Sequence, residues 1–310
     1  IIAGETPGGW AAAWNHASAT GRLQVFDFGF DLANPCTFWA GVIGGGVLCI
    51  GTHGTDHMMV QRYLASRGPR EAGRALAGSG VAVVLQFALF LGIGILLSAY
   101  HAGTGEPPPA RVDEVFAAFI VNHFPQNVGL VGLLLAAILA AAMSTLSSSL
   151  NASASALMHD FLLPLRRRHE TETEQSRQPE SMLLLSRGLT VVFGLVQIAV
   201  GLAATRLDAT VVRAALTIAG VSAGLLLGVF TLGIGTRRVG ATAALVGASC
   251  GLATLLAVQF LLPTRGVIVA FPWYALIGSS TTFAAGLAAS LIWPRSPEDA
   301  PWEKPNAIET

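Results

Sequence analysis

Seven apolar stretches of roughly twenty residues constrain the fold of this chain more than any other feature. A bilayer core takes about 20 apolar residues per helix, so each stretch can cross it. None alternates apolar and polar residues as the strands of a membrane barrel do. Backbone groups in lipid must be hydrogen-bonded within their own segment, so we predict an all-α polytopic membrane protein with about seven transmembrane helices. The predicted spans are Phe38–Val60, Ala75–Tyr100, Gly129–Leu150, Leu183–Ala204, Val211–Ile234, Val239–Leu262 and Pro272–Trp293.

The low charge content supports this class and argues against several others. Charged residues make up 12% of the chain, whereas a soluble domain carries about 25%. The formal net charge is zero, which leaves no basic surface for nucleic acid. The sequence contains no glycine-rich phosphate loop with a lysine, so nothing indicates a nucleotide-driven pump. The cysteines, Cys36, Cys49 and Cys250, follow no metal or redox spacing.

The distribution of basic residues predicts the orientation of the chain. With the N-terminus outside the cell, thirteen of the eighteen Lys and Arg residues fall in cytoplasmic segments, as the positive-inside rule requires. We therefore expect a multi-pass protein of the plasma or inner membrane with a cytoplasmic C-terminus. The thirteen are Arg62, Arg67, Arg70, Arg74, Arg166, Arg167, Arg168, Arg177, Arg187, Arg237, Arg238, Arg295 and Lys304.

The connecting segments differ in character. Residues 1–37 and the loop 101–128 are expected on the extracellular or periplasmic side, and an amphipathic piece within that loop, Val112–Phe124, predicts a short helix. Residues 160–182 mix arginine with glutamate and predict a cytoplasmic loop. The polar tail 295–310 is expected to be cytoplasmic and disordered.

Glycines are concentrated in the first predicted span, which ends in polar residues. A break in this helix would expose backbone groups able to hold a solute or an ion, but the same glycines could simply allow close helix packing. Asp56 is a functional candidate because ionisable groups inside spans are rare, yet an ion pair with Arg62 at the inner surface fits equally well. The residues alone leave both alternatives open. The glycines are Gly44, Gly45, Gly46, Gly51 and Gly54.

The third predicted span carries an unusual density of polar side chains. Eight hydroxyl or amide side chains fall within residues 144–155, and several recur at intervals of three and four, which gives the helix one polar face. Hydroxyls can bond to the carbonyl one turn earlier and so survive in lipid, which supports a packing face. Hard cations prefer oxygen ligands, which supports a sodium site instead. By contrast, we interpret the glycines of the fifth span, Gly220, Gly224, Gly228 and Gly233, as packing positions.

Three motifs resemble those of the sodium:solute symporter family. Gly54-Thr55-Asp56-His57 followed by Val60-Gln61-Arg62-Tyr63-Leu64 resembles its GTDQ…VQRYL signature. Ala140-Ala141-Ala142-Met143-Ser144-Thr145-Leu146-Ser147-Ser148-Ser149-Leu150-Asn151 resembles its AAxMSTLSSxLN helix. Leu227-Gly228-Val229-Phe230-Thr231-Leu232-Gly233-Ile234 resembles its LGxFxLG helix. The three occur in the family's order and spacing.

The resemblance implies a leucine-transporter-like fold of two inverted five-helix repeats. Residues 38–234 would form the second repeat and residues 235–294 two additional C-terminal spans. The chain is then expected to be a C-terminal fragment whose partner is the missing N-terminal half of the same transporter. Its other expected partners are a small-molecule solute, the sodium ion and the lipid bilayer.

The resemblance also implies particular site residues. The main sodium ion (Na⁺) would be held by the Ala141 carbonyl and the Ser144 and Thr145 hydroxyls, with Ser147 at a second sodium site of some members. The inner gate and the floor of the solute site would lie near three consecutive residues of the first span, namely Gly51, Thr52 and His53.

The chain departs from the family pattern at positions that bear on the solute. His57 replaces the usual glutamine, and Val83 and Leu216 stand where sugar carriers place a lysine and a glutamine, which disfavours a monosaccharide. The predicted function is sodium-coupled symport of a small solute such as a monocarboxylate, a vitamin-like compound or another small organic or anionic molecule. A sodium-gated channel or membrane sensor is the alternative. A membrane enzyme would need an acid–base pair, and the spans offer only Asp56 and nearby histidines, so we expect no enzyme.

Overall fold

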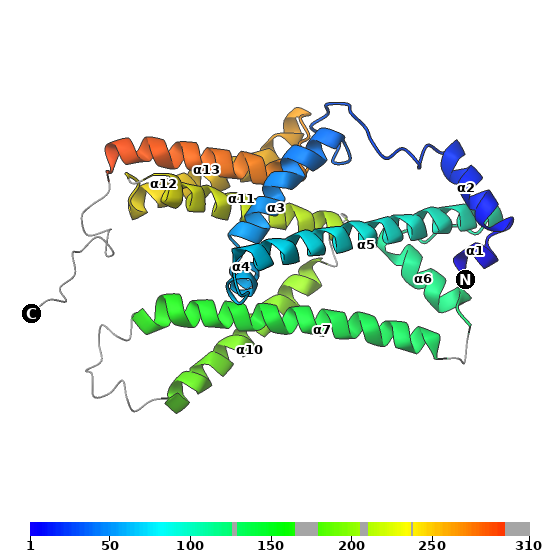
Figure 1. Cartoon of the computed structure of the whole chain (residues 1–310), viewed down its shortest axis with the longest axis horizontal. Helices are drawn as coiled ribbons and strands as arrows, with labels where there is room; N and C mark the ends of the chain where they lie inside the picture. Colours follow the sequence, from blue (N-terminus) through cyan, green and yellow to red (C-terminus); the bar gives the residue numbers. More distant parts are fainter. Residues whose placement is uncertain (126–128, 165–178, 205–209, 237, 295–310) are drawn as a thin grey trace, which may run out of the picture. The chain divides into compact units, whose positions relative to one another are not determined.

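The computed structural model describes residues 1–125, 129–164, 179–204, 210–236 and 238–294, and within these ranges it is built from helices (Figure 1). The predicted all-helical membrane fold is confirmed, because six of these helices are long and apolar enough to cross a bilayer. They are α5 (Pro69–Thr104), α7 (Leu130–Ala156) with its π-helical extension η3 (Leu157–Leu162), α10 (Pro179–Ala204), α11 (Val211–Gly235), α12 (Ala241–Leu256) with η4 (Ala257–Leu261), and α13 (Pro272–Ile292).

The first predicted span, Phe38–Val60, is interrupted, as one of the two alternatives left open for its glycines required. It forms a π-helical segment, η1 (Ala40–Gly45), joined to a short α-helix, α3 (Gly46–Gly54), and together these are too short to count among the long spans. The chain leaves the helix at Thr55-Asp56 and continues as α4 (His57–Leu64). Glycine lowers helix stability by up to about 1 kcal/mol per residue, which explains why this glycine-rich stretch is irregular.

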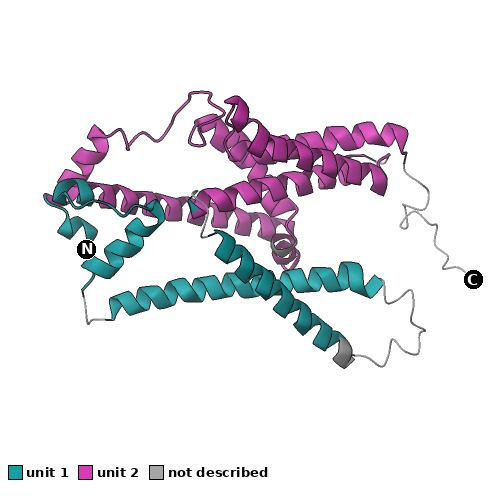
Figure 2. Cartoon of the chain, turned by 180° about the vertical axis from the view of Figure 1, so that it is seen from behind, with its two compact units in different colours: residues 1–7, 100–210 teal, residues 8–99, 211–310 magenta. Residues whose placement is uncertain are grey.

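The chain forms two compact units (Figure 2). Unit 1 contains residues 1–7 and 100–210, and unit 2 contains residues 8–99 and 211 onward. The predicted division at residues 37, 234 and 294 stays a prediction. Most of the expected cytoplasmic loop (165–178) and the whole tail (295–310) lie outside the described residues.

The centre of unit 2 is a three-helix assembly of α11, α12 and α13 that depends on small residues. A Cβ on Gly228 of α11 would lie 2.5 Å from Thr282 Cβ, and one on Gly247 of α12 would lie 2.6 Å from the Thr282 carbonyl oxygen. A Cβ on Gly251 would overlap the Thr282 hydroxyl. Because lipid gives helices no hydrophobic reason to associate, close approach through small residues holds such assemblies together. The packing interpretation is thus confirmed for Gly228.

The η1–α3 segment joins this assembly through two glycines, Gly44 of η1 and Gly51 of α3. A Cβ on Gly44 would come within 2.6 Å of the Pro272 carbonyl at the start of α13, and one on Gly51 within 3.0 Å of Ala223 Cβ on α11. Gly46 and Gly54 have nothing within 4 Å of such a Cβ. Two glycines of this stretch therefore serve packing, and Gly54 instead ends the helix just before the break.

Unit 1 combines two crossing helices with a short helix from the segment between α5 and α7. Helix α10 packs against α7, as Figure 2 shows in teal. The helix expected over Val112–Phe124 is present as a single 3₁₀ turn, Val112–Glu114, followed by α6 (Val115–His123). Phe119 and Ile120 of α6 are buried. The end of α5, from Tyr100, belongs to this unit.

Close packing at Gly228 predicts that alanine there destabilises the protein more than alanine at Gly233. Gly228→Ala should lower the free energy of unfolding by about 1–3 kcal/mol, because the added methyl group overpacks against Thr282. Gly233→Ala on the same helix meets nothing within 4 Å and should be neutral or stabilising. Thermal unfolding of the purified variants in detergent measures both effects. Equal melting temperatures for the two variants would contradict the packing described for α11.

Candidate sodium and solute sites

The predicted sodium ligands lie on one exposed face of α7. At 3.6 residues per turn, Ala141, Ser144, Thr145 and Ser148 fall within about 100° of one another around the helix axis. The first three of these are exposed in the structure, and so is Ser147. The Thr145 hydroxyl donates to the Ala141 carbonyl at 3.2 Å, which places two of the expected ligand oxygens side by side. The face therefore offers a row of oxygens that no described side chain of unit 1 covers.

The part of α7 next to this face uses a polar group for helix packing, because Ser149 lies one helical turn after Thr145. Gln197 of α10 donates from Nε2 to Ser149 Oγ at 3.1 Å, and Gly194 lies against Leu150. Ser148 donates instead to the Ser144 carbonyl at 3.0 Å. Both interpretations of the polar helix thus find support, since Ser149 bonds to α10 and the exposed residues Ala141, Ser144, Thr145 and Ser147 remain available to a ligand.

The predicted gate residues form a compact hydrogen-bonded group at the end of α3. Thr52 donates to the Leu48 carbonyl at 3.0 Å. His53 Nδ1 lies 3.2 Å from Thr52 Oγ1 and 3.1 Å from the Cys49 carbonyl oxygen. Both side chains are half-buried. Because Gly51 is pressed against α11, Thr52 and His53 are held on the part of α3 that does not face that helix.

The remaining predicted residues occupy the break and the adjoining helices. Asp56 lies between α3 and α4 and Arg62 lies in α4, and both are exposed. Val83 is an exposed residue of α5 and Leu216 a half-buried residue of α11, so both apolar substitutions stand within membrane-spanning helices.

A polar cluster in unit 1 was not expected from the sequence. The buried Tyr100 hydroxyl donates to Glu106 Oε2 at 2.8 Å and lies 2.6 Å from His123 Nε2. The His123 ring stacks on Phe119 with centroids 4.8 Å apart. The Phe119 and His123 spacing of four in α6 could have indicated a shared face, but the loop fold that brings Glu106 to them has no local signal.

The helices and the two candidate sites together indicate one class of protein. A short, glycine-rich helix that ends in a break packs against α11 and α13, and another helix, α7, bears an oxygen-rich face; this combination is typical of secondary transporters. The model of the sodium:solute symporter family matches residues 31–251. The chain therefore belongs to the sodium:solute symporter family.

The curated relatives are longer transporters. The chain is 28% identical over 244 residues to the human sodium/iodide cotransporter, covering 78% of this chain and 36% of that protein. It is 30% identical over 253 residues to human sodium-coupled monocarboxylate transporter 1, covering 79% and 39%. It is 28% identical over 295 residues to the rabbit sodium-dependent multivitamin transporter, covering 94% and 42%. The chain thus spans about two fifths of the length of these relatives.

A solved structure supports the fold. A substrate-bound, outward-open Na⁺-coupled sialic acid symporter superposes with a TM-score of 0.72 at 25% identity, covering 94% of this chain and 57% of the other. The transporter fold that the motifs imply is therefore confirmed for the part of it that this chain covers.

The hydrogen bond between Gln197 and Ser149 predicts an energetic coupling between these two side chains. Gln197→Leu and Ser149→Ala should each cost about 0.6 kcal/mol of unfolding free energy, the average for polar contacts between membrane helices. The double variant should cost no more than one of them, because both remove the same bond. Ser148→Ala, whose hydroxyl bonds only its own helix, is the matched control. Chemical unfolding in mixed micelles measures all four, and additive losses would show that the two side chains do not interact.

Proposed function

We propose that this chain is part of a sodium-coupled symporter for a small anionic solute. Family membership and the oxygen-lined face of α7 support the proposal together, because the motif that identifies the family is the same segment that carries the oxygens. The single observation that carries it is the pairing of the Thr145 hydroxyl with the Ala141 carbonyl on an exposed face. Transport of this kind needs no enzymatic chemistry by the chain.

The chemistry of this face suits sodium. A hard cation binds oxygen atoms, and a carbonyl next to hydroxyls offers partial negative charge without the cost of burying a carboxylate. Ala141, Ser144 and Thr145 would supply one part of the Na⁺ coordination shell, and Ser147 would contribute to a second site. Each sodium ion that moves inward releases about 2.3 kcal/mol per 100 mV. Because a monovalent anion cancels the charge of one sodium ion, the membrane potential drives its uptake only when more than one sodium ion accompanies it.

The identity of the solute follows from the relatives and from two substitutions. Relatives of this chain are named for iodide, monocarboxylates and sialic acid, all of them anions. Val83 and Leu216 remove the polar groups that sugar carriers of the family place there. A monocarboxylate is therefore the favoured solute class, and a neutral monosaccharide is disfavoured.

The broken end of α3 would act as the inner gate. Gly51, Thr52 and His53 would form the floor on which the solute rests, and release would follow when the break at Thr55-Asp56 opens toward the cytoplasm. Asp56 and Arg62 would then stabilise the inner end of this helix. Because the chain spans about two fifths of its relatives, we propose that further transporter sequence, including the first repeat, completes both sites.

Counterflow in proteoliposomes tests the function. The complete transporter that contains this chain should exchange external labelled lactate for internal lactate only when sodium is present, and glucose should not compete. A channel would show no counterflow, because it cannot couple the two solute movements. Sodium-independent exchange would refute the coupling to sodium.

Variants of the oxygen-lined face locate the sodium site. Ser144→Ala with Thr145→Ala should raise the sodium concentration for half-maximal uptake by about tenfold or more, because a bond to a charged group contributes about 1.5–3 kcal/mol. Thr190→Val on α10, which removes a hydroxyl bonded to the Ser186 carbonyl, should leave this concentration unchanged. If the double variant keeps its sodium dependence, the proposed ligands are wrong.

The proposed orientation places residues 1–37 outside the cell and the C-terminus in the cytoplasm of a plasma or inner membrane. Cys36 is exposed in this segment. In a Cys49→Ala, Cys250→Ala background, a membrane-impermeant maleimide should label Cys36 in intact cells. Labelling only after the cells are opened would reverse the orientation.

A further inference from the structure

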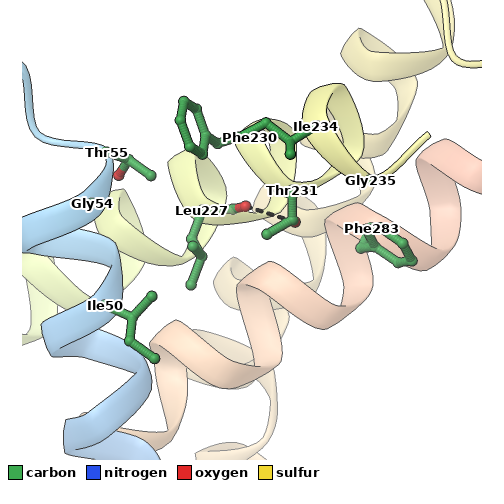
Figure 3. A pocket seen from close by; sticks show the side chains of 9 residues that line it. All are labelled: Ile50, Gly54, Thr55, Leu227, Phe230, Thr231, Ile234, Gly235 and Phe283. Carbon is green, nitrogen blue, oxygen red and sulfur yellow. Dashed lines mark hydrogen bonds between the residues drawn. The ribbon is translucent and has the colours of Figure 1, made fainter. Parts of the chain in front are cut away.

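A cavity of about 450 Å³ lies in unit 2 between α3, α11 and α13 (Figure 3). Ile50 and Thr55 of α3 line it, together with Leu227, Phe230 and Thr231 of α11 and Phe283 of α13. The lining of α11 runs from Leu227 to Gly235, where that helix ends. Eight residues of α-helix rise by about 12 Å, so the cavity extends by that distance along the last two turns of α11.

The lining residues favour a hydrocarbon occupant. Thr231 donates its hydroxyl to the Leu227 and Gly228 carbonyls at 2.7 and 2.9 Å. Thr55 donates its hydroxyl to the Gly51 carbonyl at 2.7 Å. The other side chains of the lining are aliphatic or aromatic, as Figure 3 shows. A polar solute would therefore lose its hydrogen bonds to water here without replacement, which is costly.

The cavity and the proposed gate involve different residues of the same short segment. At 3.6 residues per turn, Ile50, Gly54 and Thr55 span about 140° around the axis of α3, and Thr52 and His53 lie outside that arc. An occupant of this cavity would thus contact the helix that carries the proposed solute floor without competing with the solute.

Arginines are frequent in the chain segments that follow the cavity-lining ends of α3 and α11. Five exposed arginines and only two acidic residues, Asp56 and Glu71, occur in the segment from Asp56 to Arg74 and at position 238. Arg238 follows Gly235 by three residues. Each basic residue near a membrane surface contributes about 1 kcal/mol of attraction to anionic lipid. The arginines are Arg62, Arg67, Arg70, Arg74 and Arg238.

We propose that this cavity binds one acyl chain of an anionic phospholipid, whose headgroup is held by these arginines. The volume argues against a transmembrane helix as the occupant, since 12 Å of helix about 10 Å wide fills roughly 900 Å³, twice the space present. A bound acyl chain would contact Ile50, about one turn before the break at Thr55-Asp56. The lipid composition would therefore affect the position of the proposed gate.

Photolabelling in nanodiscs tests the site. Both this chain and the complete transporter would be reconstituted with phosphatidylglycerol that carries a diazirine in its acyl chain, and labelled peptides would be mapped by mass spectrometry. We expect labelling of Ile50–Thr55 and Leu227–Gly235, and about fivefold less with the equivalent phosphatidylcholine, which lacks the net negative charge. Labelling requires no sodium and no transport, so its failure is distinct from a failure of the proposed symport.

Matched variants separate the cavity from the rest of the lipid-facing surface. Thr231→Phe should fill the cavity and reduce labelling there about tenfold or more, since filling or emptying a hydrophobic pocket changes binding by 10–200-fold. Thr217→Phe is the control, because Thr217 lies on the same helix, bonds its own backbone in the same way and does not line the cavity. Arg238→Gln should lower the preference for phosphatidylglycerol without abolishing labelling.

Three results would overturn the proposal. Undiminished labelling in Thr231→Phe would place the lipid elsewhere. Equal labelling by the two phospholipids would refute the role of the arginines. Labelling of this chain alone that disappears in the complete transporter would show that protein covers the cavity.

Discussion

Backbone hydrogen bonding in lipid determines most of this structure. Each amide and carbonyl inside the bilayer must find its partner within its own segment, so apolar stretches of this length become helices. A break is tolerated only where protein or water can meet the freed groups. The interruption at Thr55-Asp56 is therefore a chemically significant position, because backbone groups become available there beside the residues proposed to hold the solute.

Small residues serve two purposes in this chain. On α11 and α12 they let helices approach until Gly228 and Gly247 touch Thr282, which stabilises the three-helix centre of unit 2. On α7 the small residues carry hydroxyls, and one of these, Ser149, bonds to α10. The neighbouring Thr145 and Ala141 oxygens remain on an exposed face, where we propose that they bind sodium.

Helix α3 takes part in helix packing, in the proposed solute site and in the lining of the cavity. Gly51 is pressed against Ala223 of α11, which anchors the helix. Thr52 and His53 form the proposed solute floor on a second side. Ile50 and Thr55, which lie on either side of Gly51 around the helix axis, line the apolar cavity. A nine-residue helix with one anchored face is short enough for ligands on its other faces to alter its position.

The sequence by itself determined the fold class, because apolar length and the backbone requirement in lipid are local properties. Its motifs also determined the family and the candidate sodium and solute residues of α7 and α3. Only the tertiary structure decided which glycines pack, since Gly51 and Gly54 are alike in sequence and differ in their neighbours. The same holds for the Tyr100, Glu106 and His123 cluster and for the cavity between α3, α11 and α13. These features bring together residues that are far apart in the chain. The periodicity of one helix shows which of its faces is apolar, but it does not specify which residues of another helix that face contacts.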